Sequence, residues 1–154
     1  MPQFFRVKIY IAADHAGFYL KKSLIQYLDI KGYEVEDVGA FEKNDDDDYV
    51  DFCAACAKKV ASDSNSVGIV IGGSGNGEAI VANKIKGIRA AVYNSGKVDI
   101  AKAAKEHNNA NILSLGARFI TDQEAKRAVT VWLEAKFEGG RHQRRIDKIS
   151  ELEK

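Results

Sequence analysis

The stretch "VGIVIGGSGNGEAI", residues 67–80, combines the features that decide the fold of this chain. Its apolar run, 67–71, predicts a short strand that is buried on both faces. A loop with four glycines in six residues follows, and a helix-period segment comes after the loop. Strand, glycine loop and helix in this order are typical of the anion-binding turn of parallel α/β proteins. Glu78, however, stands where a phosphate loop would carry a lysine.

The rest of the chain repeats this alternation. Further strands are predicted at 6–12, 33–39, 88–94 and 111–116, and helices at 17–30, 48–61, from the glycine loop to about 85, at 96–107, at 121–136 and from about 141. Five strands alternating with helices predict an α/β fold, a Rossmann-like three-layer α/β/α sandwich with a five-stranded parallel sheet. We expect a single domain over 1–154 with the strand order 2-1-3-4-5.

Composition excludes several classes of protein. The net charge is +1, which favours neither nucleic acid nor an anionic membrane as a partner. The apolar runs fall short of the roughly 20 residues of a membrane span, and the amino terminus lacks the long apolar core of a signal peptide. Two cysteines provide no disulfide framework. We therefore expect a cytoplasmic protein.

The polar ends of two strands locate the expected site. In doubly wound sheets, ligands bind beyond the carboxyl ends of the strands, where the strand order reverses. For the expected order, that point lies between the first and third strands, which end in "AADHAG" (12–17) and "GGSGNGE" (72–78). These two segments should face each other across one crevice.

The glycine loop fits neither nucleotide-binding fingerprint. Glu78 replaces the third glycine of the dinucleotide pattern, and Glu78 with Ala79 replaces the lysine and hydroxyl of the Walker pattern. What remains is a nest of backbone amides over 73–77, with the Ser74 hydroxyl and a carboxylate beside it. An oxyanion hole next to a base suits proton abstraction α to a carbonyl. The alternative is a tight turn in which Glu78 only complements the helix dipole.

The histidines and arginines leave alternatives open. The three histidines, His15, His107 and His142, lie in polar clusters, and their spacing lacks the i, i+4 pattern of a helical zinc pair, so no metal site is expected. Arg141 and Arg145 are one helical turn apart and could grip phosphate bidentately. Taken alone, the segment "RHQRR" is more typical of a solvated helix face, and a nucleic-acid patch would need a broader basic surface.

Two further motifs are interpreted as structural. The pair in "CAAC" (53–56) lies inside a predicted helix among alanines rather than at a helix start, so Cys53 and Cys56 are interpreted as small core residues and not as a redox pair. The run "DDDD" (45–48) is interpreted as a solvated loop and helix start without the spacing of a calcium loop.

Four motifs together resemble the type B ribose-5-phosphate isomerase family. They are "AADHAG", "GGSGNGEAIVANKIKGIRAA" (72–91), "EHNNANILSLGAR" (106–118) and "EGGRHQRRI" (138–146), and the resemblance covers nearly the whole chain. The wider group includes allose-6-phosphate and galactose-6-phosphate isomerases. The resemblance implies a Rossmann-like sandwich that forms homodimers, possibly tetramers, with the helix over about 141–153 on a partner subunit. It also implies an isomerase without cofactor or metal.

The resemblance implies roles for the matching residues. Glu78 matches the base that moves a proton between C2 and C1 in one branch, whereas another branch has cysteine at position 72 and no carboxylate at 78. His107 matches the proton donor for opening of the furanose ring, Asp14 handles ring hydroxyls, and Ser74 with the loop amides holds the enediolate oxygen. The substrate-binding residues implied are Asp14, His15, Tyr49, Gly73, Ser74, Gly75, Asn76, Gly77, Asn108, Arg118, Arg141, His142 and Arg145.

Within this set, His15 and Arg118 would approach the phosphate, and Arg141 and Arg145 would reach it from the neighbouring subunit. Val50 departs from the proline often found beside the family's tyrosine, here Tyr49. The leading hypothesis is an aldose–ketose isomerase acting on ribose 5-phosphate and ribulose 5-phosphate. Alternatives are the same reaction on another sugar phosphate (allose 6-phosphate, galactose 6-phosphate or a tetrose phosphate) and a non-catalytic phosphate-sugar binding module.

Overall fold

One parallel sheet organises the molecule. The structure, a computed structural model, describes residues 6–154. Residues 1–5, where the sequence analysis expects no signal peptide, lie outside the described residues. Within 6–154, five parallel strands follow the order β2-β1-β3-β5-β4. They are β1 (Lys8–Ala13), β2 (Val35–Gly39), β3 (Ser66–Gly72), β4 (Ala90–Tyr93) and β5 (Ile112–Gly116).

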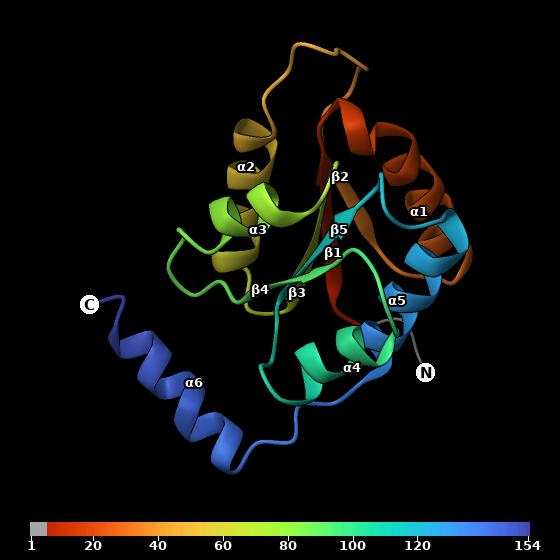
Figure 1. Cartoon of the computed structure of the whole chain (residues 1–154). Helices are drawn as coiled ribbons and strands as arrows, with labels where there is room; N and C mark the ends of the chain where they lie inside the picture. The colour runs from red at the N-terminus through yellow and green to blue at the C-terminus, as the bar shows by residue number, and fades with distance from the viewer. Residues whose placement is uncertain (1–5) are drawn as a thin grey trace.

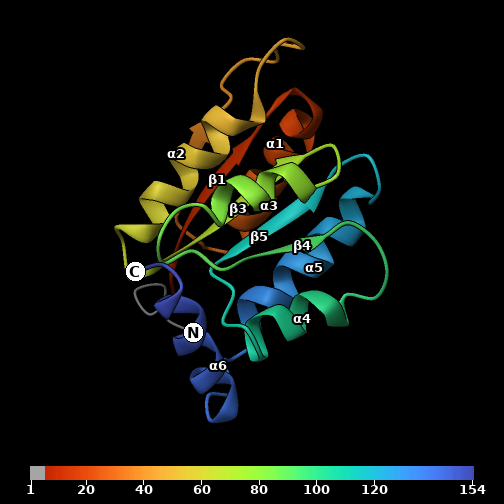
Figure 2. The ribbon, with the colours of Figure 1, turned by 60° about the vertical axis from the view of Figure 1, so that its left-hand side comes forward.

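Helices cover both faces of this sheet (Figures 1 and 2). One face carries α1 (Phe18–Ile30), α4 (Asp99–Glu106) and α5 (Asp122–Glu134), and the other carries α2 (Tyr49–Ala61) and α3 (Asn76–Ala82). A 3₁₀ turn, η2 (His15–Gly17), precedes α1, and α6 (Arg141–Glu151) extends away from the sheet in Figure 1. The predicted three-layer α/β/α sandwich is confirmed. None of the helices in the described part of the chain has the length and apolar character to cross a membrane.

The central strand β3 joins the two halves of the core. All seven of its residues are buried, as its apolar sequence predicts for a strand covered on both faces. Ile69 and Ile71 pack into the cluster under α1 and α5, whereas Val70 packs on the opposite side with Cys53 and Cys56. The two cysteines are thus core residues of α2, as predicted, and their thiols are free and buried.

The order of the last two strands differs from the prediction. After β3 the chain first forms β4 at the edge of the sheet. It then returns to form β5, which lies between β3 and β4. The burial of the two strands explains this arrangement, because all five residues of β5 are buried while three of the four in β4 are only half-buried. A strand that is apolar on both faces gains most from a central position. The expected crevice between β1 and β3 is unaffected.

A buried lysine fixes the segment that follows β2. Lys21 of α1 is only 1% exposed, and its ammonium lies 2.7 Å from a carboxylate oxygen of Asp37 while also donating to the Ala40 carbonyl. Buried charges persist in proteins when they are paired in this way. The ion pair therefore holds the end of β2 against α1, next to the polar end of β1.

We expect Lys21→Ala to lower the free energy of unfolding by roughly 1–3 kcal/mol, because the Ala40 carbonyl and the Asp37 carboxylate lose their partner. Chemical denaturation of the variant measures this loss. Lys22→Ala, at the neighbouring exposed position of α1, is the matched control and should change stability by no more than about 0.5 kcal/mol. Equal effects of the two substitutions would contradict the structural role of Lys21.

Candidate active site

A cavity of about 500 Å³ lies at the carboxyl ends of β1 and β3. Both polar strand ends contribute to it, as the crevice rule predicts. Its lining consists of Asp14, His15, Ala16, Tyr49, Gly73, Ser74, Gly77, Glu78, Arg118 and Phe119. Eight of the predicted site residues are therefore brought together within one chain.

Asp14 and His15 are held by the turn after β1. Asp14 caps η2, and its carboxylate accepts hydrogen bonds from the amides of Ala16 at 2.9 Å and Gly17 at 3.3 Å. His15 is paired with Asp47, whose carboxylate lies 2.8 Å from Nδ1 and also accepts from the His15 amide. The hydrogen bond to Asp47 raises the pKa of His15, and the charge of Asp14 adds to this effect. A protonated His15 would place positive charge at the cavity.

Asp47 corrects the interpretation of the acidic run. The side chain of this residue is only 9% exposed and binds His15, so the run is not uniformly a solvated loop. The signal was hidden because four consecutive aspartates look alike in sequence. Only the path of the loop selects which carboxylate turns inward.

Glu78 is a buried carboxylate at the first turn of α3. It is 4% exposed, and its Oε1 accepts a hydrogen bond from the Gly75 amide at 3.3 Å. Burial raises the pKa of this carboxyl, the nearby charge of Asp14 raises it further, and backbone hydrogen bonds oppose both effects. Glu78 therefore complements the start of the helix, as the alternative interpretation has it, and also lines the cavity. A raised pKa suits a carboxylate that must accept and return a proton.

Gly72 leaves the space that the Glu78 carboxylate occupies. A Cβ atom at position 72 would lie 1.8 Å from Glu78 Oε1, far inside van der Waals contact. This gives a steric reason for the pairing of glycine at 72 with glutamate at 78. A cysteine at 72 and a carboxylate at 78 cannot occupy this geometry together.

The glycine loop uses some of its own amides internally. Gly75 adopts a φ of +83°, and its amide binds Glu78, while the Asn76 amide binds the Ser74 hydroxyl at 3.1 Å. The expectation that these two amides hold a substrate oxygen therefore requires their hydrogen bonds to rearrange. The Gly73 and Gly77 amides, with the Ser74 hydroxyl, are the other predicted donors.

Sequence reasoning missed two residues that shape this loop. Ser114 of β5 donates to the Gly75 carbonyl at 2.6 Å, and Asn94, just after β4, donates to the Ser74 carbonyl at 2.9 Å. Ser114 is fully buried, so the one hydroxyl in the apolar segment "NILSLG" was the available signal. Both bonds satisfy carbonyls of the glycine loop and tie the loop to β5 and to the end of β4.

Tyr49 and Arg118 cover the glycine loop from two sides. A Cβ at Gly77 would lie 2.7 Å from the Tyr49 hydroxyl, and one at Gly73 would lie 3.0 Å from the Arg118 guanidinium. The absence of side chains at both glycines thus lets an aromatic ring and a cation approach the backbone closely. Arg118 is exposed and adds a bidentate donor suited to phosphate.

A second group of predicted residues lies elsewhere. His107 and Asn108 precede β5, at the amino edge of the sheet, and α6 carries Arg141, His142 and Arg145 beyond that edge (Figure 1). The five residues of β5 separate the two edges by roughly 16 Å, at about 3.3 Å per residue. At this distance His107 does not reach the carboxyl end of its own sheet. The second group can meet Glu78 only in another copy of the chain.

The buried cysteines have no reactive character. Burial raises the pKa of the Cys56 thiol to about 12 and raises that of the Cys53 thiol as well, with the Glu78 charge contributing to the latter. Nucleophilic or redox chemistry requires a thiolate, which is disfavoured at both positions. Glu78 is a carboxylate that the cavity offers beside the glycine loop.

The fold and this carboxylate-containing cavity match one enzyme family. The chain belongs to the ribose/galactose isomerase family, whose model matches residues 9–149, and it is an aldose–ketose isomerase. It is 44% identical over 149 residues to ribose-5-phosphate isomerase B of Mycolicibacterium paratuberculosis, with 96% of this chain and 92% of the relative covered.

Solved structures of relatives show the same fold. The crystal structure of ribose-5-phosphate isomerase B from Mycoplasma genitalium with bound ribulose-5-phosphate superimposes with a TM-score of 0.92 at 46% identity, covering 95% of each chain. Ribose-5-phosphate isomerase B from Clostridium thermocellum gives a TM-score of 0.90 at 45% identity, covering 95% of this chain and 97% of the relative.

We expect Gly72→Ala to destabilise the protein by about 1–3 kcal/mol, the range typical of overpacking, and to displace the Glu78 carboxylate. The double variant Gly72→Ala/Glu78→Ala should recover most of this loss, because the second substitution removes the clashing oxygen. Denaturation of both single variants and the double variant completes the cycle. Strictly additive losses would show that the two positions do not interact.

Proposed function

We propose that this enzyme interconverts ribose 5-phosphate and ribulose 5-phosphate through an enediolate, with Glu78 as the base. The observation that carries the proposal is the buried Glu78 carboxylate, with its raised pKa, beside the amide loop of the cavity. The relative from Mycoplasma genitalium with bound ribulose-5-phosphate supports this choice of sugar.

The proposed reaction moves one proton between adjacent carbons. Glu78 removes the proton from C2 of the open-chain aldose, and the electrons pass to the carbonyl oxygen at C1, which gives the enediolate. The Ser74 hydroxyl and neighbouring amides stabilise this negative charge. Glu78 then returns the proton to C1, and the proton of the C2 hydroxyl passes to the C1 oxygen as the ketone forms at C2. Positioned acid–base catalysis of this kind contributes typically about 10²–10⁴-fold to the rate.

The phosphate group would be held by cations at the cavity rim. Arg118 lies over Gly73, and His15 gains positive charge more readily because Asp47 raises its pKa. Binding of the phosphate, which does not react, supplies energy that positions the sugar against Glu78. Arg141 and Arg145 would complete this subsite from a second subunit.

A homodimer is proposed because one chain holds only part of the predicted residue set. The second group, defined as His107, Asn108, Arg141, His142 and Arg145, would enter the cavity of the partner and supply the acid that opens the furanose ring. In this arrangement α6 packs on the partner subunit. In a dimer with twofold symmetry, the second group of each subunit meets the Glu78 cavity of the other subunit, so that both sites are complete.

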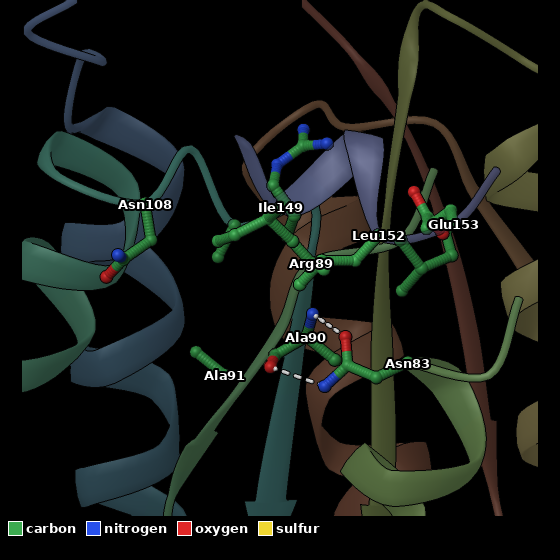
Figure 3. Close-up of a pocket in the computed structure, with 10 residues that line it drawn as sticks. Asn83, Arg89, Ala90, Ala91, Asn108, Ile149, Leu152 and Glu153 are labelled. Carbon is green, nitrogen blue, oxygen red and sulfur yellow. Dashed lines mark hydrogen bonds between the residues drawn. The ribbon is translucent and has the colours of Figure 1, made fainter. Parts of the chain in front are cut away.

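The surface around α6 supports this assembly. A cavity of about 440 Å³ lies between α6 and edge strand β4, and Figure 3 shows Ile149 of α6 and Leu152, which directly follows α6, facing Arg89 and Ala90. Leu152 is 84% exposed and Ile149 is half-exposed. Continuous with it, Ile80 and Val92 line a second hollow along β4. An apolar surface beside an unpaired strand edge is a surface that a partner normally covers.

Two further features belong to this proposal. The free, buried thiols are consistent with a cytoplasmic protein.

The second candidate function, isomerisation of another sugar phosphate, would use the same cavity and the same base, so turnover of ribose 5-phosphate, allose 6-phosphate and erythrose 4-phosphate must be compared directly.

We expect Glu78→Gln to lower kcat for ribose 5-phosphate by about 10²–10⁴-fold while sugar-phosphate binding persists, because the amide keeps the shape but cannot accept the proton. Coupled assays of ketose formation and calorimetric binding measure the two quantities. In the wild type, kcat/KM should fall with decreasing pH as Glu78 becomes protonated. Because burial raises its pKa, this decline should occur at a higher pH than for an exposed glutamate. Full activity of Glu78→Gln would remove Glu78 from the mechanism.

Mixed dimers test whether the site is shared. A heterodimer of one Glu78→Gln chain and one His107→Asn chain, purified with two affinity tags, should have about half the wild-type activity, because one of its two symmetric sites is complete. The matched control pairs a wild-type chain with a chain that carries both substitutions. This control should be inactive if His107 acts on the partner's cavity, whereas a site within one chain predicts the reverse pattern.

A further inference from the structure

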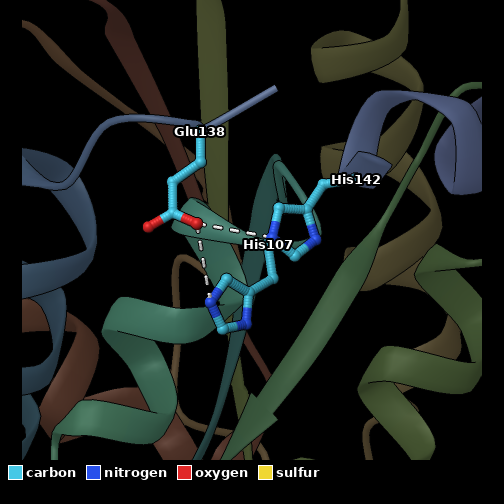
Figure 4. Close-up of side chains that lie close together, drawn as sticks. All are labelled: His107, Glu138 and His142. Carbon is cyan, nitrogen blue, oxygen red and sulfur yellow. Dashed lines mark ion pairs between the residues drawn. The ribbon is translucent and has the colours of Figure 1, made fainter. Parts of the chain in front are cut away.

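Three side chains with metal-binding atoms converge near the start of α6. His107 directly follows α4, Glu138 lies in the segment between α5 and α6, and His142 is the second residue of α6. Their ligand atoms all lie within 4.8 Å of one another. Figure 4 shows the Glu138 carboxylate directed toward both imidazoles. The Glu138 Oε1 atom is 3.3 Å from His142 Nε2 and 3.9 Å from His107 Nε2.

The backbone builds this cluster. The Glu138 amide donates to the carbonyl of Glu106 at 2.9 Å, which ties the connecting segment to the end of α4. Gly139 and Gly140 then adopt φ values of +69° and +56°, and this turn directs α6 so that His142 stacks on His107. The rings lie 4.6 Å apart between centroids, with 12° between their planes.

The Nε2 atom of His142 is buried without a hydrogen-bond partner among the described residues. His142 is only 6% exposed, and although Glu138 lies 3.3 Å from Nε2, the pair does not have the geometry of a hydrogen bond. A buried polar atom of this kind costs free energy unless a ligand satisfies it. The orphaned nitrogen points to a bound species that accepts its lone pair.

Two imidazoles and one carboxylate select the class of ligand. This donor set is that of three-ligand zinc sites with an open fourth position, whereas magnesium and calcium prefer oxygen ligands. Zinc–ligand bonds of about 2.0–2.2 Å in a tetrahedron place the ligand atoms roughly 3.3–3.6 Å apart. The distances of Glu138 to the two imidazoles, 3.3 and 3.9 Å, are close to that range. The two rings are stacked with 12° between their planes, so their in-plane lone pairs do not converge on one point, and the half-exposed His107 must rotate to bind the same ion as His142.

We propose that His107, Glu138 and His142 form a reversible binding site for Zn²⁺ or a similar late first-row divalent cation. The expectation from sequence that the chain has no metal site rests on the family resemblance and on histidine spacing along one helix, and such spacing does not detect ligands that three segments contribute. The consequence for activity rests on the proposed function. A metal on His107 would take away the lone pair and proton that ring opening uses, so the cation would inhibit the enzyme.

A competing cluster is provided by Asp14, His15 and Asp47. It has a single imidazole, and that ring already pairs with Asp47 at 2.8 Å, while the Asp14 carboxylate accepts two backbone amides. Asp47 Oδ2 is also buried without a hydrogen-bond partner among the described residues, but this cluster is the weaker candidate for zinc because it offers one imidazole instead of two and that ring is already paired. It serves as an internal control for the assignment.

Direct binding tests the site without reference to activity. Calorimetric titration of the full chain with Zn²⁺ should show one site per chain, and Co²⁺ should give the visible absorption of a tetrahedral complex. Glu138→Gln and His142→Asn should each weaken Zn²⁺ binding by about tenfold or more, since even residues outside the ligand set cost 10–100-fold. Asp47→Asn should leave the affinity unchanged. Thermal unfolding confirms that each variant is folded.

The outcomes separate this site from the proposed function. Unchanged zinc affinity in folded Glu138→Gln and His142→Asn, or a loss confined to Asp47→Asn, would overturn the site. Inhibition by Zn²⁺ that is reversed by a chelator and relieved in Glu138→Gln would support both the site and the role of His107. Zinc binding at these residues without inhibition would support the site and contradict the role of His107 in ring opening.

Discussion

The burial of the Glu78 carboxylate against the backbone of Gly72 is the constraint on which the rest of the site depends. A buried charge is costly, and here a backbone amide offsets part of the cost while the neighbouring Asp14 adds to it. The geometry tolerates no side chain at position 72 and requires a left-handed residue at Gly75. This turn directly follows the wholly buried strand β3, which positions it at the cavity. Burial of the carboxylate in this turn is therefore the main cause of its raised pKa.

The sheet divides the predicted residues between its two edges. Asp14, Glu78 and Arg118 follow strands and lie at the carboxyl edge, whereas His107 and the α6 residues precede or lie beyond the amino edge. The amino and carboxyl ends of the strands of a parallel sheet lie on opposite sides of the sheet, so one chain cannot bring the two sets of residues together. This separation, with the apolar surface along α6 and β4, is the reason we propose a dimer in which two copies bring these residues together.

The second group also has chemistry of its own. The stacked imidazoles and Glu138 form a compact donor set whose buried nitrogen lacks a hydrogen bond among the described residues. The same features that would prepare His107 to exchange a proton, an accessible lone pair and a nearby carboxylate, also suit a soft divalent cation. Acid catalysis and metal binding would compete for one atom.

The sequence by itself determined the layer architecture and the crevice between β1 and β3, because strand periodicity and glycine positions are local signals. Tyr49 and Arg118, which also line the cavity, were implied only by the resemblance to the isomerase family. The sequence did not determine that β5 takes the inner position of the sheet and β4 the edge. That order depended on how deeply each strand is buried. It also did not reveal which aspartate of the acidic run binds His15, or that Ser114 and Asn94 orient the glycine loop. Glu138 joined the two histidines only through the turn at Gly139 and Gly140. These contacts link residues far apart in the chain, and only the packing of the tertiary structure brings such residues together.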